Sequence, residues 1–410
     1  MLKYCGLLEI ALIVLFAASI SAADDAITFN TNFEDASLAK IEPMGPTQFR
    51  CHVVGQTDEH GHNRQATWYY FRMDHVAGKQ IALTLTDFVG EYHNQPGVSP
   101  MGPDIFPVFS NDGRHWQHFP AVDFDSQKKE TTLHFTSSGD SIWIAHVPPY
   151  TPSDLAKLLA DLRTRPATMV ETIGKTVQGR DIPLVTVTNP DVDDSSKKLI
   201  WLQARQHAWE AGTSFVMEGA LRFITSDDPE AKSLRDKFIF KFTPMVDLDG
   251  CANGQVRSNA NGYDVNQHWK EVDLKHPELL RLMPEIWYTK KAILTCNTIH
   301  RIDLLVNMHN TETGEYLDTE ASDAETLKLM RHFDALLAEK TSFDRSTPLT
   351  VRAMAPDDTN SLYGQAKIPV LLLEQRISTD KKLGRHPTTE DRLSFGKQLI
   401  GEMAEAVLLK

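Results

Sequence analysis

The spacing of apolar positions along the chain changes near residue 150. Between about 27 and 147, apolar residues come in short runs that are rich in β-branched and aromatic side chains and broken by Gly, Pro, Asn and Asp. Several such runs in succession predict strands that pack as an all-β sandwich. The clearest runs are 66–76, 79–89, 105–113, 131–140 and 141–150.

Prolines mark the end of this first region. The segment 148–154, "PPYTPSD", cannot continue a strand, because proline lacks a backbone N–H. Ser153 or Asp154 can cap the helix that the next twelve or so residues predict. We therefore expect a β-sandwich domain at 23–150 and a second domain at 151–410. A chain of 410 residues agrees with two hydrophobic cores.

In the second region, apolar runs alternate with helical patterns. The runs lie at 183–189, 197–203, 238–247, 302–310 and 368–377. The helical patterns lie at 212–225, 276–295, 325–341 and 392–409. Apolar runs without polar alternation predict strands buried on both faces, and intervening helices favour parallel pairing. The predicted fold class is α/β, with a mixed, largely parallel sheet flanked by helices, preceded by the all-β sandwich.

The first 22 residues have the composition of a secretory signal. Lys3 precedes an apolar stretch at 7–16, which only Glu9 interrupts, and small residues follow near Ala22. Such a stretch is too short to favour a stable membrane span. We therefore expect a signal peptide at 1–22 and a secreted or periplasmic protein without a stable membrane span after cleavage.

Charge and cysteine content narrow the function classes. The formal net charge of −13 argues against a nucleic-acid partner, which requires a basic surface. Beyond the predicted signal the cysteines are Cys51, Cys251 and Cys296, which allow at most one internal disulfide. None of them has C-x-x-C spacing, so a cysteine-rich zinc site is not expected.

Polar side chains follow the predicted strands where ligands bind in open α/β sheets. His207 and Glu210 come after the run 197–203, His309 ends the run 302–310, and Glu374 interrupts the run 368–377. Two His and one Glu form a known catalytic zinc set that leaves one position open. A carboxylate that is not a ligand can then act as general base.

Each residue also has a simpler interpretation. An H-x-x-E pair occurs by chance in many proteins, and a His after a strand often only donates a structural hydrogen bond. Glu374 can instead pair with Arg376 or with a lysine. The combination of all four residues favours the metal site over these alternatives.

Several ordered motifs together resemble the M14-type zinc carboxypeptidases, in the cytosolic-carboxypeptidase-like branch. "ARQHAWEAGTSFVMEGALRFI" is similar to the zinc loop of that branch, with Ala208 and Trp209 where Pro and Gly usually stand. "VNMHNTE" resembles the strand of the third ligand, and "LLLEQR" the strand of the catalytic glutamate. The β-rich front half resembles the N-terminal domain of the branch.

The resemblance implies roles for individual residues. One Zn²⁺ per chain is implied on His207, Glu210 and His309, with Glu374 as general base. A guanidinium that polarises the scissile carbonyl, an aspartate that orients the first ligand histidine and an asparagine that holds the substrate carboxylate are also implied. These three are Arg257, Asp264 and Asn266.

One position departs from the family pattern. Gln267 stands where the family usually has an Arg directly after the asparagine, and glutamine cannot neutralise a carboxylate. Arg352, at the position of a mobile family tyrosine by a gap-free count, or Arg376 can replace that charge.

We expect a secreted zinc metallocarboxypeptidase that hydrolyses the C-terminal amide bond of peptide or peptide-like substrates. The alternatives are a zinc amidohydrolase on a non-standard amide or ester, such as a cell-wall peptide or modified glycan, and an inactive binding protein.

Overall fold

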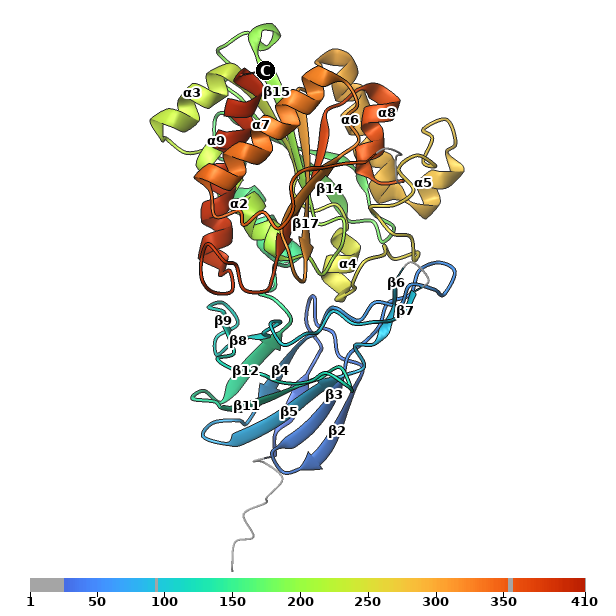
Figure 1. The fold of residues 1–410 in the computed structure, drawn as a ribbon, viewed down its shortest axis with the longest axis vertical. Helices are drawn as coiled ribbons and strands as arrows, with labels where there is room; N and C mark the ends of the chain where they lie inside the picture. The colour runs from blue at the N-terminus through green and yellow to red at the C-terminus, as the bar shows by residue number, and fades with distance from the viewer. Residues whose placement is uncertain (1–25, 93–94, 353–356, 410) are drawn as a thin grey trace, which may run out of the picture.

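The computed structural model describes residues 26–92, 95–352 and 357–409. It contains two stacked bodies (Figure 1). The lower body, here called the N-terminal β domain, holds strands β1 to β12, and the upper body, the C-terminal α/β domain, holds all later elements. Between them the chain runs from the end of strand β12 at Ala145 to the start of helix α1 at Pro152. We propose 150/151 as the boundary within this segment.

Two five-stranded sheets form most of the N-terminal β domain. The first contains, in spatial order, β1 (Thr28–Asn30), β4 (Tyr70–Asp74), β12 (Ser141–Ala145), β8 (Val108–Ser110) and β9 (Gln117–His118). The second contains β10 (Asp123–Asp125), β11 (Glu130–Thr136), β5 (Gln80–Thr86), β3 (Gln48–His52) and β2 (Lys40–Gly45). A separate hairpin consists of β6 (Gly90–Tyr92) and β7 (Gln95–Val98).

Alternation along the strands places one face of these sheets in a core. In β5, Ile81, Leu83 and Leu85 are buried, while the residues between them are partly exposed. Phe49, Phe71 and other apolar side chains from both sheets join the same core. This period of two is what the sequence pattern predicts for a sheet with one buried face.

The C-terminal α/β domain is built on an eight-stranded sheet. Its strands, in spatial order, are β13 (Thr168–Lys175), β14 (Asp181–Val187), β16 (Phe238–Thr243), β15 (Lys198–Ala204), β17 (Leu304–Thr311), β20 (Val370–Arg376), β18 (Tyr316–Thr319) and β19 (Thr350–Val351). The four central strands β16, β15, β17 and β20 are mutually parallel, and antiparallel pairs flank them. The mixed, largely parallel sheet is therefore confirmed.

Helices cover both faces of this sheet (Figure 1). On one side lie α2 (Gly212–Ile224), α3 (Pro229–Lys237), α7 (Ala324–Lys340) and α9 (Thr389–Leu408). On the other side lie α5 (Glu278–Leu282), α6 (Pro284–Ile299) and α8 (Leu362–Ala366). Helix α2 packs closely on α9. The helices approach at Gly396, where a Cβ atom would lie only 1.9 Å from the carbonyl oxygen of Val216. Two short helices, α1 (Pro152–Leu162) and α4 (Leu248–Asn253), lie nearer the N-terminal β domain.

Two local predictions differ from the structure. The helical pattern at 276–295 is broken into α5 and α6 at Met283, because Pro284 has no N–H to continue the first helix. Helix α1 is capped by Thr151 rather than by Ser153 or Asp154. Asp154 instead closes the capping box as its third helical residue.

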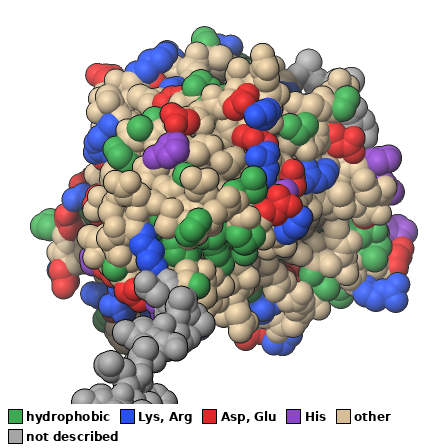
Figure 2. Space-filling model, turned by 90° about the horizontal axis from the view of Figure 1, so that it is seen from below, with side chains coloured by type: hydrophobic (Ala, Val, Ile, Leu, Met, Phe, Trp, Pro, Cys, Tyr) green, Lys and Arg blue, Asp and Glu red, His purple; other side chains and the backbone are tan. Residues whose placement is uncertain are grey.

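Cys51, Cys251 and Cys296 are free thiols, so they form no disulfide in the described chain. No helix within the described ranges combines the length and apolar content needed to cross a bilayer. From below, Lys and Arg side chains are interspersed with Asp and Glu over the end of the molecule that the N-terminal β domain forms (Figure 2). That face therefore presents both signs of charge.

Candidate active site

The four residues predicted for the metal centre meet at one edge of the sheet. Strand β15 ends at Ala204, and the following turn carries His207 and Glu210. His309 lies on β17, and Glu374 lies directly opposite it in the register of β20. Parallel strands bring their carboxyl ends to the same edge, so residues far apart in sequence become neighbours.

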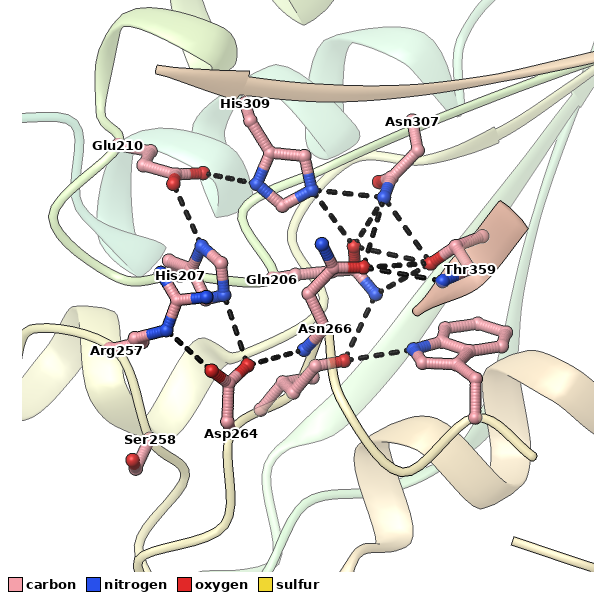
Figure 3. A network of polar contacts seen from close by, with 12 residues as sticks. Gln206, His207, Glu210, Arg257, Ser258, Asp264, Asn266, Asn307, His309 and Thr359 are labelled. Atoms are coloured by element: carbon pink, nitrogen blue, oxygen red, sulfur yellow. Dashed lines mark hydrogen bonds and ion pairs between the residues drawn. The ribbon is translucent and has the colours of Figure 1, made fainter. Parts of the chain in front are cut away.

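His207, Glu210 and His309 converge on one point (Figure 3). One carboxylate oxygen of Glu210 lies 2.8 Å from Nδ1 of His207, and the other lies 2.9 Å from Nδ1 of His309. The two imidazole centroids are 4.9 Å apart, and one ligand atom from each residue lies within 4.8 Å of the others. All three side chains are buried.

The outer nitrogen of each imidazole contacts polar side chains outside the ligand set. Nε2 of His207 lies 3.1 Å from Asp264, whereas Nε2 of His309 lies 2.9 Å from Nδ2 of Asn307 and 3.2 Å from Oε1 of Gln206. A proton held on Nε2 of His207 and donated to Asp264 leaves the Nδ1 lone pair of His207 directed at Glu210. Two imidazole nitrogens and a carboxylate are a donor set that suits Zn²⁺, so these residues fit the metal that the resemblance implies.

Electrostatics within the cluster favours an ionised carboxylate. Burial by itself raises the pKa of Glu210, but His309 and His207 outweigh it and bring the pKa down to about 2. Burial lowers the pKa of His207, yet the charges of Glu210 and Asp264 leave it raised overall. The carboxylate of Glu210 therefore stays ionised between the two imidazoles, where it can bind a cation.

A tight turn aims the first two ligands. Arg205 has a left-handed backbone with φ of 57°, which bends the chain directly after β15. Its buried guanidinium donates to the carbonyl oxygens of Tyr150 at 3.0 Å and of Ala208 at 2.6 Å. The turn is thereby tied to the segment that joins the two domains.

Arg257 and Asp264 form the wall beside His207. The carboxylate of Asp264 accepts from Nε of Arg257 through one oxygen and faces His207 through the other. Although burial raises the pKa of Asp264, Arg257 and His207 bring it well below its ordinary range. Asp264 therefore stays ionised and links the guanidinium to the ligand histidine.

The carboxyl group of Glu374 has a different environment. Its Oε2 is buried and has no hydrogen-bond partner among the described residues. Burial raises the pKa of Glu374 well above its ordinary value, and the negative charges of Glu210 and Asp318 add to this rise. Such a carboxylate takes up a proton more readily than an exposed one.

These groups face a cavity of about 560 Å³ between the two domains. His207, Glu210, Arg257 and Glu374 line it from the C-terminal α/β domain. Residues from the N-terminal β domain, including Arg64, Glu91, Tyr92, Ser99 and Met101, form the facing wall. The N-terminal β domain therefore forms one wall of the cavity that contains the site.

The structure brings three of the four predicted substrate contacts to this cavity. Asn266, Gln267 and Arg352 line it. Arg352 is already engaged there, since it donates to Asp358 at 2.8 Å and also pairs with Asp318.

Arg376 does not line the cavity. It is buried at the end of β20, where Asp344 at 3.1 Å and Ser346 at 2.6 Å hold its guanidinium. The guanidinium two residues after Glu374 is therefore held by these two contacts, outside the cavity.

A buried network of amide side chains, which was not predicted from the sequence, lies next to the outer nitrogen of His309 (Figure 3). Gln206 accepts from Asn307 at 2.6 Å, and Oδ1 of Asn266 accepts from Thr359 at 3.1 Å. Asn307 interrupts the apolar run that carries His309, which was an available signal. Tyr92, in contrast, lies in a hairpin with no local pattern that indicates a site.

Solved structures with the same fold cover almost the whole chain. The crystal structure of a metallo-carboxypeptidase from Burkholderia cenocepacia has a TM-score of 0.81 and 21% identity, and the match covers 93% of this chain and 99% of that one. A metallo-carboxypeptidase from Pseudomonas aeruginosa has a TM-score of 0.77 at 20% identity, covering 93% and 100%. At these identities the likeness supports the fold.

Curated relatives match over a shorter span. Cytosolic carboxypeptidase 2 of Macaca fascicularis is 36% identical over 290 residues, which is 66% of this chain and 33% of that protein. Cytosolic carboxypeptidase 3 of Bos taurus is 25% identical over 322 residues, 72% of this chain and 30% of that protein. The chain thus spans about a third of the length of these relatives.

The expectation of a secreted or periplasmic protein is wrong. These relatives are named cytosolic carboxypeptidases, and residues 29–147 match the cytosolic carboxypeptidase N-terminal domain. The expectation depended on the predicted signal at 1–22, which lies outside the described residues. Its weakness is physical, since Glu9 puts a carboxylate into a stretch that should be uniformly apolar.

A second family model matches part of the C-terminal α/β domain. The zinc carboxypeptidase family model matches residues 155–287, directly after the N-terminal match and including the turn with His207 and Glu210. His309 and Glu374 lie beyond that match, and the sheet returns them to the same edge. The chain belongs to the zinc carboxypeptidases, in the branch that carries the N-terminal domain of the cytosolic carboxypeptidases.

Proposed function

We propose that this protein is a zinc-dependent metallocarboxypeptidase that hydrolyses the C-terminal amide bond of peptides. The observation that carries this proposal is the convergence of two imidazole Nδ1 atoms on the two oxygens of Glu210, at 2.8 and 2.9 Å. Glu374 and Arg257 face the same cavity. The site therefore combines a metal pocket, a base and an oxyanion-binding cation.

His207, Glu210 and His309 would hold one zinc ion per chain. When bound, zinc supplies Lewis acidity for the scissile carbonyl and lowers the pKa of the attacking water. Asp264 and Gln206, on the outer imidazole nitrogens, keep both histidines oriented toward that ion.

Glu374 acts as the general base and acid. Its carboxylate accepts a proton from the attacking water and then delivers it to the leaving nitrogen. The raised pKa of Glu374 suits both steps, because the carboxyl group must hold the proton between them. Arg257 binds the carbonyl oxygen as negative charge develops there, through the guanidinium hydrogens that Asp264 does not engage.

Asn266, Gln267 and Arg352 would contact the C-terminal end of the substrate. Gln267 offers a neutral hydrogen bond, and Arg352 shares its charge with Asp318 and Asp358. This weaker grip favours a second candidate, an amidohydrolase whose substrate has no free carboxylate at this position.

The test compares one peptide as a free acid and as its C-terminal amide, with zinc-loaded protein. A carboxypeptidase should release the last residue of the free acid, and it should hydrolyse the amidated peptide at least about tenfold more slowly. Equal turnover of both peptides would favour the amidohydrolase. Absence of zinc-dependent hydrolysis of both would contradict both candidates.

A further inference from the structure

A side chain from the N-terminal β domain holds the backbone around Arg257. Oε1 of Gln56 accepts from three consecutive N–H groups, of Val256 at 2.9 Å, Arg257 at 2.6 Å and Ser258 at 3.0 Å. Nε2 of the same amide donates to the carbonyl oxygen of Ser258 at 2.8 Å. One glutamine therefore satisfies four backbone groups of a loop two hundred residues away.

Gln56 is itself anchored in its own domain. Its backbone exchanges hydrogen bonds with Gln65 at 2.7 and 2.9 Å. Three successive N–H groups directed at one oxygen form a concave nest, which fixes the loop conformation more firmly than a single bond. The loop that carries Arg257 is therefore fastened to the N-terminal β domain.

A second residue of that domain contacts the guanidinium itself. The Cζ atom of Arg257 lies 5.3 Å from the ring centroid of Tyr92, which ends strand β6. Asp264 accepts from Nε of the same guanidinium and also faces His207 (Figure 3). A cation beside an aromatic face is attracted to it, so the Tyr92 ring restricts the guanidinium orientation that Asp264 selects.

We propose that Gln56 and Tyr92 are positioning residues that place Arg257 for oxyanion binding. The inference rests on the proposed hydrolase function, and it gives the N-terminal β domain a part in the chemical step. Oxyanion donors act only at about hydrogen-bond distance from the developing charge, and their loss typically costs about 100- to 1,000-fold in kcat. If Arg257 is no longer held in position, kcat should fall by part of that 100- to 1,000-fold range.

The decisive experiment is a double-mutant cycle between Gln56 and Arg257. Gln56→Leu should lower kcat 10- to 100-fold (about the partial loss of an oxyanion donor) with KM changed less than threefold and zinc content unchanged. In an Arg257→Ala background the same change should alter kcat less than twofold, because the group to be positioned is gone. An equal loss in both backgrounds would overturn the proposal.

Tyr92 provides a variant with little risk to folding, since it lies at the cavity wall. Tyr92→Phe keeps the ring and should retain kcat within about threefold, whereas Tyr92→Leu should lose at least tenfold. Equal effects of the two substitutions would contradict the role of the ring. The matched control is Asp104→Ala, which removes another contact between the domains, to Thr379 at 2.6 Å, and should leave kcat unchanged.

A readout without turnover separates this inference from the proposed function. The measurement is the NMR signal of the Arg257 Nε–H group, which Asp264 accepts from and the Tyr92 ring contacts. In the wild-type protein this proton should give a shifted resonance that exchanges slowly with water. The resonance is assigned by its loss in Arg257→Lys. Gln56→Leu and Tyr92→Leu should broaden or move that resonance, and an unchanged signal in both would overturn the proposal. If the wild type hydrolyses no peptide, the proposed function fails while this measurement still decides the positioning.

Discussion

The imidazole of His146 and the indole of Trp209 pack with their centroids 5.8 Å apart, between the last strand of the β domain and the metal loop. The Tyr69 ring also packs against the imidazole, in an edge-on contact with the centroids 5.4 Å apart. Neither nitrogen of this buried histidine has a hydrogen-bond partner among the described residues. Burial lowers the pKa of His146 to about 3.

This contact predicts acid sensitivity. Below the ordinary histidine pKa of about 6.5 the unfolded chain binds a proton that the folded site rejects, so stability falls as the pH drops from about 6.5 toward 3. At pH 5 the loss should be about 2 kcal/mol relative to pH 7. His146→Phe should remove that part of the loss in denaturant unfolding at the two pH values.

An identical pH dependence of the wild type and His146→Phe would show that His146 takes up its proton in the folded protein.

Glu374→Gln should separate activity from stability. Loss of the base should lower kcat by about 1,000-fold or more, because glutamine cannot carry the proton. The same change removes a buried carboxylate repelled by Glu210 and Asp318, so the metal-free protein should become about 1–2 kcal/mol more stable at pH 7. Activity assays and chemical unfolding measure the two effects, and a destabilised variant would contradict the electrostatic account.

Gln206 should tune zinc binding through His309. Gln206→Met keeps the length of the side chain but removes the acceptor 3.2 Å from Nε2 of His309. The zinc affinity should fall about tenfold, measured by competition with a chromophoric chelator. Gln203→Met is the matched control, because Gln203 bonds to Asn307 at 3.0 Å within the same network. Equal affinity losses in both variants would assign the effect to the network as a whole.

Gln267→Arg should strengthen binding of free-acid peptides. The new guanidinium would line the cavity next to Asn266 and could pair with the terminal carboxylate. KM for the free acid should fall about tenfold, with little change for the amidated peptide. An unchanged KM would indicate that Arg352 already binds the carboxylate despite its contacts with Asp318 and Asp358.

The sequence alone determined the sheet and the set of residues at its edge. Apolar runs without alternation required strands buried on both faces, and intervening helices required parallel connections. A polar residue near or just beyond the end of such a run lies close to the carboxyl edge, so His207, His309 and Glu374 could be assigned to one place. Pro284 also indicated a helix break, since proline cannot continue a helix, although we predicted one continuous helix across it.

Only the tertiary structure decided which arginine lies at the cavity. Arg352 and Arg376 have the same chemistry and both lie near the strand of Glu374. Asp318 and Asp358 hold the first at the cavity wall, while Asp344 and Ser346 hold the second away from it. The choice depends on which acceptors surround each guanidinium after folding, and no period or motif records that.

The contribution of the N-terminal β domain to the site also came from the tertiary structure. Gln56 and Tyr92 sit in segments without a motif, yet both reach Arg257. The local sequence pattern predicts the period and the ends of a helix or strand, because interactions between residues close in sequence determine both. The contact between two domains arises from the shapes of two finished surfaces, so it exists only when both have folded.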